Sequence, residues 1–100
     1  MTLEEIQRLV AQRRYRYSKK VRDLIEEGFF NEEDIVHCIL SADTIYKRER
    51  DELQQAVHGM KYVSLGRDTY GRPFYTVGKG MQNPRGRFYF CITAHQADDP

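Results

Sequence analysis

One histidine and a group of cations in this chain have the residue types that act on phosphate esters. His95 falls at the end of a predicted strand, and the usual histidine pKa, about 6.5, suits proton transfer near neutral pH. Arg67, Arg72 and Lys79 could bind phosphate, a role that suits the planar fork of arginine. The alternatives are a solvated turn for Arg72 and an exposed strand end for His95.

Cleavage of RNA without a metal ion needs few groups. A base takes the 2′-hydroxyl proton, an acid protonates the leaving 5′-oxygen, and a cation stabilises the phosphorane. The chain lacks the Asp/Glu or His spacing of a metal site, the phosphate-binding P-loop motif and the Gly-x-Ser-x-Gly elbow. Cys38 and Cys91 have no CxxC or Cys/His context. We therefore expect reduced thiols, no metal and no cofactor.

The charged residues are segregated along the chain, although the net charge is only +1. Six basic residues and no acid lie between Arg13 and Arg22, and Lys20 is one of them. Six more basic residues lie between positions 59 and 97, against the single acid Asp68. Because lysine and arginine neutralise backbone phosphates, this pattern predicts a surface that binds nucleic acid. Basic segments on many proteins are only solvated surface, so this alternative stays open.

Length and composition limit the architecture. A chain of 100 residues with 40% hydrophobic residues predicts a single domain, residues 1–100, with one modest core. No stretch approaches the ~20 apolar residues of a membrane span. The acidic N-terminus does not resemble a signal peptide. We therefore expect a cytoplasmic protein with no membrane partner.

The first part of the chain, residues 3 to about 41, has the pattern of helices. Thr2, Ser18 and Asn31 each precede a segment with helical spacing of apolar residues and could cap a helix. Gly28 could end the second helix, because glycine tolerates the left-handed conformation found after helix C-termini.

The pattern changes to strands over residues 43 to about 96. We predict strands at 44–49, 60–67, 72–79 and 87–95, joined by a polar connection and two turns. Helices followed by a meander of about four strands form an α+β arrangement. The helices would pack on one face of a mainly antiparallel sheet.

Alternation along the strands predicts which side chains share a face. In the last strand Phe88, Phe90, Ile92 and Ala94 would point toward the helices. The opposite set would then be Arg87, Tyr89, Cys91, Thr93 and His95. Pairing with a strand that carries Tyr75, Val77 and Lys79 on one face would gather tyrosine, lysine, threonine and histidine together. Such a face could stack unpaired bases, although an ordinary solvent-facing sheet is polar as well.

Several short segments follow one another in a recognisable order. They are Tyr15–Arg22, Glu27-Gly28-Phe29, Glu33-Asp34-Ile35, Thr44–Lys47, Leu65-Gly66, Gly71-Arg72-Pro73-Phe74-Tyr75, Phe90–His95 and the acidic tail Asp98–Pro100. The first four segments resemble the front half of the MqsR family of toxin ribonucleases. The whole series also resembles a related bacterial family found beside YgiT-type zinc-finger antitoxins. The similarity runs from about Leu3 to Pro100, and the order and spacing of the motifs carry it.

The resemblance implies a RelE/barnase-like fold and a metal-independent endoribonuclease that cleaves mRNA. It implies the toxin of a toxin–antitoxin pair, with RNA and a zinc-finger antitoxin as partners. It also assigns a catalytic role to Lys47, which follows Tyr46, to Tyr75 and, more weakly, to Gln55. Two family histidines are replaced here, by Lys20 at the start of the second helix and by Tyr75 in the sheet. The activity is therefore altered or follows the MqsR plan of Lys, Gln and Tyr.

We assign proton transfer to Lys47 and Tyr75, with His95 and Gln55 as further candidates, and phosphate binding to Arg67, Arg72, Lys79 and Lys20. Two non-catalytic alternatives remain on the same fold. One is an RNA-binding module, which the missing family histidines favour. The other is a protein-interaction domain that docks through Phe29 and Phe30.

Overall fold

Three helices begin where the sequence predicts them, in a computed structural model that describes residues 1–97. They are α1 (Leu3–Ala11), α2 (Lys19–Glu26) and α3 (Glu32–Ser41). The Thr2 side chain accepts a hydrogen bond from the Glu5 N–H at 3.1 Å. Gly28 follows α2 with φ +87°, as expected for a glycine at a helix end. None of the helices in residues 1–97 is long and apolar enough to span a membrane.

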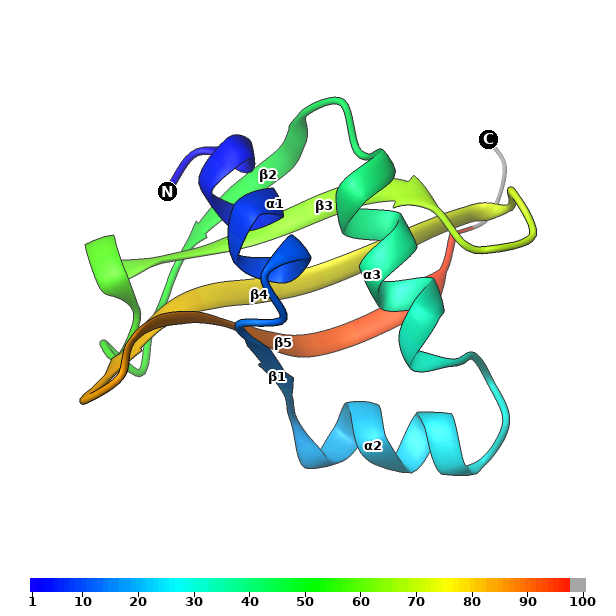
Figure 1. The fold of residues 1–100 in the computed structure, drawn as a ribbon, viewed down its shortest axis with the longest axis horizontal. Helices are drawn as coiled ribbons and strands as arrows, with labels where there is room; N and C mark the ends of the chain where they lie inside the picture. Colours follow the sequence, from blue (N-terminus) through cyan, green and yellow to red (C-terminus); the bar gives the residue numbers. More distant parts are fainter. Residues whose placement is uncertain (98–100) are drawn as a thin grey trace.

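The sheet has five strands in the order β1-β5-β4-β3-β2 (Figure 1). The strands are β1 (Tyr15–Tyr17), β2 (Ile45–Arg50), β3 (Met60–Arg67), β4 (Pro73–Asn83) and β5 (Gly86–Gln96), with a short 3-10 helix at Val57–Gly59 before β3. Strands β2 to β5 form an antiparallel meander. The α+β class is therefore confirmed, and the acidic tail at 98–100 lies outside the described residues.

The prediction of about four strands was wrong, because β1 has only three residues and so shows no periodic signal. It pairs parallel with β5. Backbone bonds hold the chain against β5 at both ends of β1, from the Tyr89 N–H to the Arg14 carbonyl (2.9 Å) and from the Ser18 N–H to the Cys91 carbonyl (3.0 Å). The turn between β4 and β5 is also shorter than predicted, because β4 continues to Asn83.

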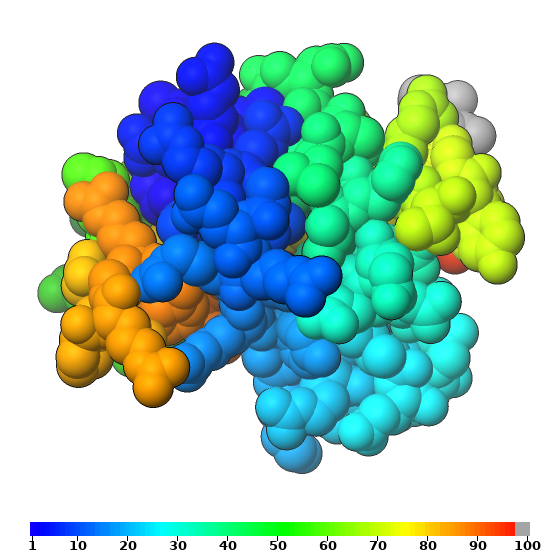
Figure 2. All heavy atoms as spheres, viewed as in Figure 1, coloured from blue at the N-terminus to red at the C-terminus, as the bar shows by residue number. Residues whose placement is uncertain are grey.

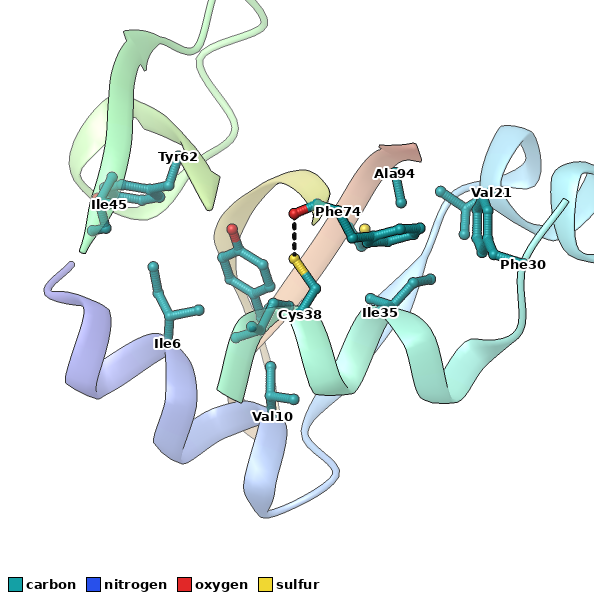
Figure 3. Packing of buried hydrophobic residues seen from close by; sticks show 13 residues of the cluster. Ile6, Val10, Val21, Phe30, Ile35, Cys38, Ile45, Tyr62, Phe74 and Ala94 are labelled. Carbon is teal, nitrogen blue, oxygen red and sulfur yellow. Dashed lines mark hydrogen bonds between the residues drawn. The ribbon is translucent and has the colours of Figure 1, made fainter. Parts of the chain in front are cut away.

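The core lies between the sheet and the helices α1 and α3, which lie over one face of it (Figures 1 and 2). Ile6 and Val10 of α1 and Ile35 of α3 are buried and belong to the same apolar cluster as Phe74 and Tyr89 of the sheet (Figure 3). Gly66 allows α3 to approach β3, because a Cβ there would lie 2.1 Å from the Cys38 carbonyl oxygen.

In the last strand, the side chains before residue 92 were predicted to lie on the wrong faces of the sheet. Tyr89 and Cys91 are 0% and 1% exposed and lie in the core cluster, so Phe88 and Phe90 point to the other side of the sheet. The cause is a β-bulge, which adds one residue to β5. Val77 pairs with Thr93 while Gly78 pairs with Cys91, and Ile92 between them has no partner.

The bulge restores the predicted facing further along β5. Ala94 is fully buried in the core cluster, as predicted, and Thr93 and His95 alternate with it. These two side chains therefore lie on the side of the sheet away from α1 and α3.

One glycine of β4, Gly78, makes room for the Tyr89 ring. A Cβ at Gly78 would lie 2.5 Å from two carbons of that ring, whereas a Cβ at Gly80 would lie 2.3 Å from the Met1 sulfur.

We expect Gly78→Ala to lower the free energy of unfolding by about 1–3 kcal/mol, because the packed ring cannot move away from the added methyl group. Gly80→Ala is the control on the same strand and should cost less, because the methionine end can move. Urea denaturation of both variants measures the difference, and equal losses would contradict the packing described.

Candidate functional site

The face of the sheet away from α1 and α3, here called the open face, receives side chains from all five strands. Strand register and alternation with the buried residues place them there. They are Arg16 of β1, Lys47 and Glu49 of β2, Lys61, Val63, Leu65 and Arg67 of β3, Tyr75, Val77, Lys79 and Met81 of β4, and Phe88, Phe90, Thr93 and His95 of β5.

Among the predicted catalytic residues, only Tyr75 and His95 contact each other on the open face. This holds for residues 1–97, which the structure describes. They lie directly opposite each other on β4 and β5. Their ring centroids are 5.6 Å apart, with an angle of 41° between the ring planes. The His95 Nε2 lies 3.0 Å from the Thr93 hydroxyl, at hydrogen-bond distance. Two strands of a continuous sheet therefore hold a phenol and an imidazole side by side.

The surroundings of His95 favour its neutral form. Burial of the ring, and then the positive charge of Lys20, lower the pKa of His95 below its usual value of 6.5. The neutral imidazole, which the shift favours, is the form that can accept a proton.

Lys20 is positioned by the start of α2. The Ser18 hydroxyl caps this helix through the Val21 N–H at 3.2 Å and donates to the Ile92 carbonyl of β5 at 2.7 Å. This double contact holds the first turn of α2 beside β5, with the Lys20 side chain exposed.

Lys47 shares the open face with this pair but does not reach it. Lys47 of β2 pairs with Val63 of β3, which pairs with Val77 of β4. Tyr75 is therefore two strands away from Lys47 and two residues further along β4 from Val77. Strand geometry puts the two Cα atoms roughly 12 Å apart. The Lys47 ammonium instead lies 3.2 Å from the Glu49 carboxylate.

Lys79 and Gln55 lie in a different cluster. Lys79 is 3% exposed, and its ammonium donates to both Asp51 carboxylate oxygens and to the Gln55 side-chain oxygen, each at 3.3 Å. Burial alone would raise the pKa of Asp51, but hydrogen bonds from the Gln55 and Ala56 backbone and from Lys79 hold it below its usual value. This burial and pairing do not support the predicted phosphate-binding role of Lys79. Its charge is neutralised and holds the β2–β3 connection against the sheet.

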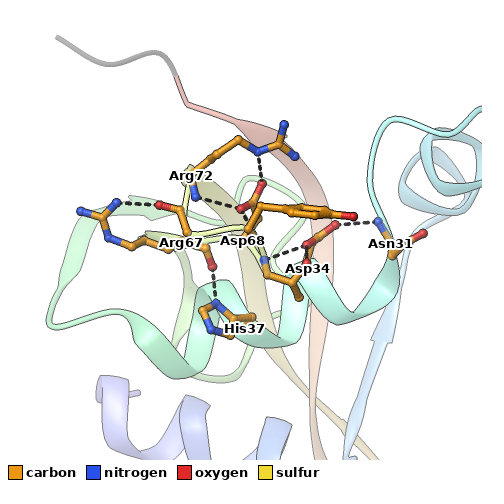
Figure 4. A network of polar contacts seen from close by, with 9 residues as sticks. Asn31, Asp34, His37, Arg67, Asp68 and Arg72 are labelled. Atoms are coloured by element: carbon orange, nitrogen blue, oxygen red, sulfur yellow. Dashed lines mark hydrogen bonds and ion pairs between the residues drawn. The ribbon is translucent and has the colours of Figure 1, made fainter.

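Arg67 and Arg72 stabilise the turn between β3 and β4 (Figure 4). The Arg72 Nε donates to the buried Asp68 carboxylate at 2.9 Å, and an Arg67 guanidinium N–H donates to the Gly71 carbonyl at 2.8 Å. Asp34 ties this turn to α3, because it accepts hydrogen bonds from the Thr69 N–H and hydroxyl. Both arginines remain exposed, so each keeps donors for a phosphate in addition to its structural role.

Sequence reasoning missed three residues of the open face. Phe88 and Phe90 were assigned to the core, and Arg16 was not singled out within its basic segment. The Arg16 guanidinium carbon lies 5.1 Å from the Phe88 ring centroid, which is a cation–π contact. The signal for this facing was Gly78 of β4, which leaves space for a large ring of the neighbouring strand that points inward.

Two further regions do not contribute to this site. A hollow of about 1030 Å³ lies between α1 and α3, where Val10, Val36, Leu40 and Glu32 line it, and it contains none of the predicted site residues. Of the predicted docking pair, Phe29 is 61% exposed, whereas Phe30 is buried edge-on against Phe74. Within residues 1–97, no group of three or more His, Cys, Asp or Glu residues is placed to hold a metal ion.

Comparison with protein-family models, with characterised proteins and with solved structures finds no match to this chain. The resemblance of its short segments to the MqsR family therefore stays a prediction.

The influence of Lys20 on His95 can be measured directly. We expect Lys20→Gln to raise the pKa of His95 toward its ordinary value, because a nearby positive charge disfavours the imidazolium form. NMR titration of the His95 ring protons gives the pKa. Lys19→Gln is the control, since the Lys19 ammonium lies 3.8 Å from the Asp23 carboxylate and Lys20 is the charge that lowers the pKa of His95. An unchanged pKa in Lys20→Gln would show that the two groups do not interact.

The buried ion pair gives a stability prediction. We expect Asp51→Ala to lower the free energy of unfolding by about 3–5 kcal/mol, because it leaves the Lys79 ammonium buried without a carboxylate. Lys79→Met should cost less, because it removes the buried charge while Asp51 keeps its backbone donors. Glu49→Ala is the exposed control, for which about 0–1 kcal/mol is expected. Urea denaturation tests all three, and a loss in Asp51→Ala no larger than in Glu49→Ala would refute a buried pair.

Proposed function

We propose that this protein is a metal-independent endoribonuclease that binds RNA on its open face. The observation that supports the proposal is the contact of Tyr75 with His95, whose pKa is lowered by burial and by the nearby exposed cation Lys20. These are the base, the acid and the cation that RNA cleavage requires. They lie on rigid strands and at a capped helix start rather than on a loop.

Each group has a distinct part in the proposed reaction. The His95 imidazole takes the proton of the ribose 2′-hydroxyl, and the 2′-oxygen attacks the phosphorus. The Tyr75 hydroxyl protonates the departing 5′-oxygen, so the products are a 2′,3′-cyclic phosphate and a free 5′-hydroxyl. Lys20 stabilises the extra negative charge of the phosphorane, and Thr93 orients the imidazole through its hydroxyl. Proton transfer from the imidazolium to the phenolate restores both groups.

The charge of the open face supports RNA as the substrate. Arg16, Lys47, Lys61 and Arg67 lie on it, whereas Glu49, the one acid among the strand residues assigned to this face, pairs with both Lys47 (3.2 Å) and Lys61 (4.0 Å). The Lys79 charge is cancelled by Asp51. The face is therefore positive along several strands, which favours a polyanion.

The resemblance of short segments to the MqsR family extends the proposal to a biological role. A toxin of a toxin–antitoxin pair would inhibit growth when expressed alone, and a zinc-finger antitoxin would relieve the inhibition. The role of Lys47 in such a toxin would be to bind phosphate, because it lies too far from Tyr75 and His95 to exchange protons with them.

A non-catalytic RNA-binding module is the second candidate function. The exposed sides of Phe88 and Phe90 and the separation of Lys47 from Tyr75 favour it, because stacking and charge suffice for binding without cleavage.

Cleavage of a long mRNA in the presence of EDTA tests the proposed function. Discrete fragments with cyclic phosphate ends are expected, and His95→Gln and Tyr75→Phe should each slow cleavage by about 10²–10⁴-fold, the usual contribution of a general acid or base. His58→Asn, in the β2–β3 connection, is the histidine control. RNA that is retarded in a gel but left intact would favour the second candidate. Cleavage at an unchanged rate in both site variants would reject the assignment of Tyr75 and His95.

A further inference from the structure

Two phenylalanines on the solvent side of the sheet need a physical explanation. Phe88 and Phe90 lie on the open face because of the bulge at Ile92, and both are partly exposed. Exposed aromatic surface is unfavourable in water unless something covers it. Arg16 covers part of Phe88. Within residues 1–97 this arginine has no carboxylate within 4.0 Å, and its side chain is exposed.

We infer that Phe88, Phe90 and Arg16 form a platform that binds an unpaired nucleobase of the RNA that His95 and Tyr75 cleave, an inference that rests on the proposed function. A planar base can stack on the phenylalanine rings or on the guanidinium plane. The free N–H groups of Arg16 can bind the phosphate of the same nucleotide.

Strand geometry sets the distance between this platform and the cleavage site. Phe90 pairs with Lys79, four residues along β4 from Tyr75, and Phe88 pairs with Met81, six residues along. At about 3.3 Å per residue these spacings are roughly 13 and 20 Å. An extended single strand advances roughly 6–7 Å per nucleotide, about twice the duplex rise. The stacked base therefore belongs to the second or third nucleotide from the scissile phosphate.

The path between the two sites follows β5 rather than β4. The β2–β3 connection covers β4 at Lys79, where Asp51 and Gln55 contact the ammonium group. The side of β5 next to β1 and α2 instead carries the cations Arg16 and Lys20. A duplex cannot lay a base flat against these rings, so the substrate is single-stranded RNA.

Binding of a short RNA tests the platform independently of cleavage. The His95→Gln variant is mixed with single-stranded eight-nucleotide RNAs that carry 2-aminopurine at one position, and fluorescence quenching is read for each position. Quenching is expected at one position, two or three nucleotides from the cut site mapped with the active protein. Phe88→Leu in the same background should abolish this quenching, because leucine keeps the apolar volume without the ring. Tyr46→Ala, an exposed aromatic on the far edge strand, is the control and should leave it intact.

Kinetics of the active protein distinguish a loss of base binding from a loss of folded protein. Phe88→Leu and Arg16→Gln should each raise KM by about 5–50-fold with kcat within about twofold, as expected for loss of one stacked base, and Phe88→Tyr should restore KM. Unchanged KM in Phe88→Leu together with unchanged quenching would overturn the inference while leaving the ribonuclease in place. Quenching that depends on Phe88 in a protein that cleaves no RNA would support the platform and reject the proposed catalysis.

Discussion

The β-bulge at Ile92 determines which side chains of β5 face the helices and which face solvent. Before the bulge, Tyr89 and Cys91 enter the core, and after it Ala94 does. Without the extra residue, either Tyr89 or Ala94 would leave the core, because alternation has a period of two. The bulge therefore lets one strand complete the core at both ends and supply His95 to the open face.

Hydrogen bonds around the bulge also position the neighbouring helix. The Ile92 carbonyl accepts a hydrogen bond from Ser18, and the Cys91 carbonyl accepts one from the Ser18 N–H. Because Ser18 also caps α2, one residue joins the helix start to the irregular part of β5. The proximity of Lys20 to His95 follows from this junction.

Ionisable residues divide into two groups with different consequences. Asp51, Asp68 and Lys79 are buried, and hydrogen bonds or ion pairs satisfy them, so they stabilise connections between strands. Lys20, Tyr75 and His95 are at least partly exposed and retain capacity for a ligand. What lies over a basic strand residue decides whether its charge is buried. Lys79 lies beneath Asp51, whereas Lys47 stays exposed beside Glu49.

The sequence by itself determined the helices and the four longer strands, because caps, turns and periodicity are local properties. Only the tertiary structure decided the parallel strand β1, the bulge, and the burial of Lys79 beneath Asp51. Each of these depends on contacts between residues far apart in the chain, such as Arg14 with Tyr89 and Asp51 with Lys79. A local pattern carries no record of such partners. Alternation also treats every residue as paired, so the part of β5 before the extra residue was assigned to the wrong face.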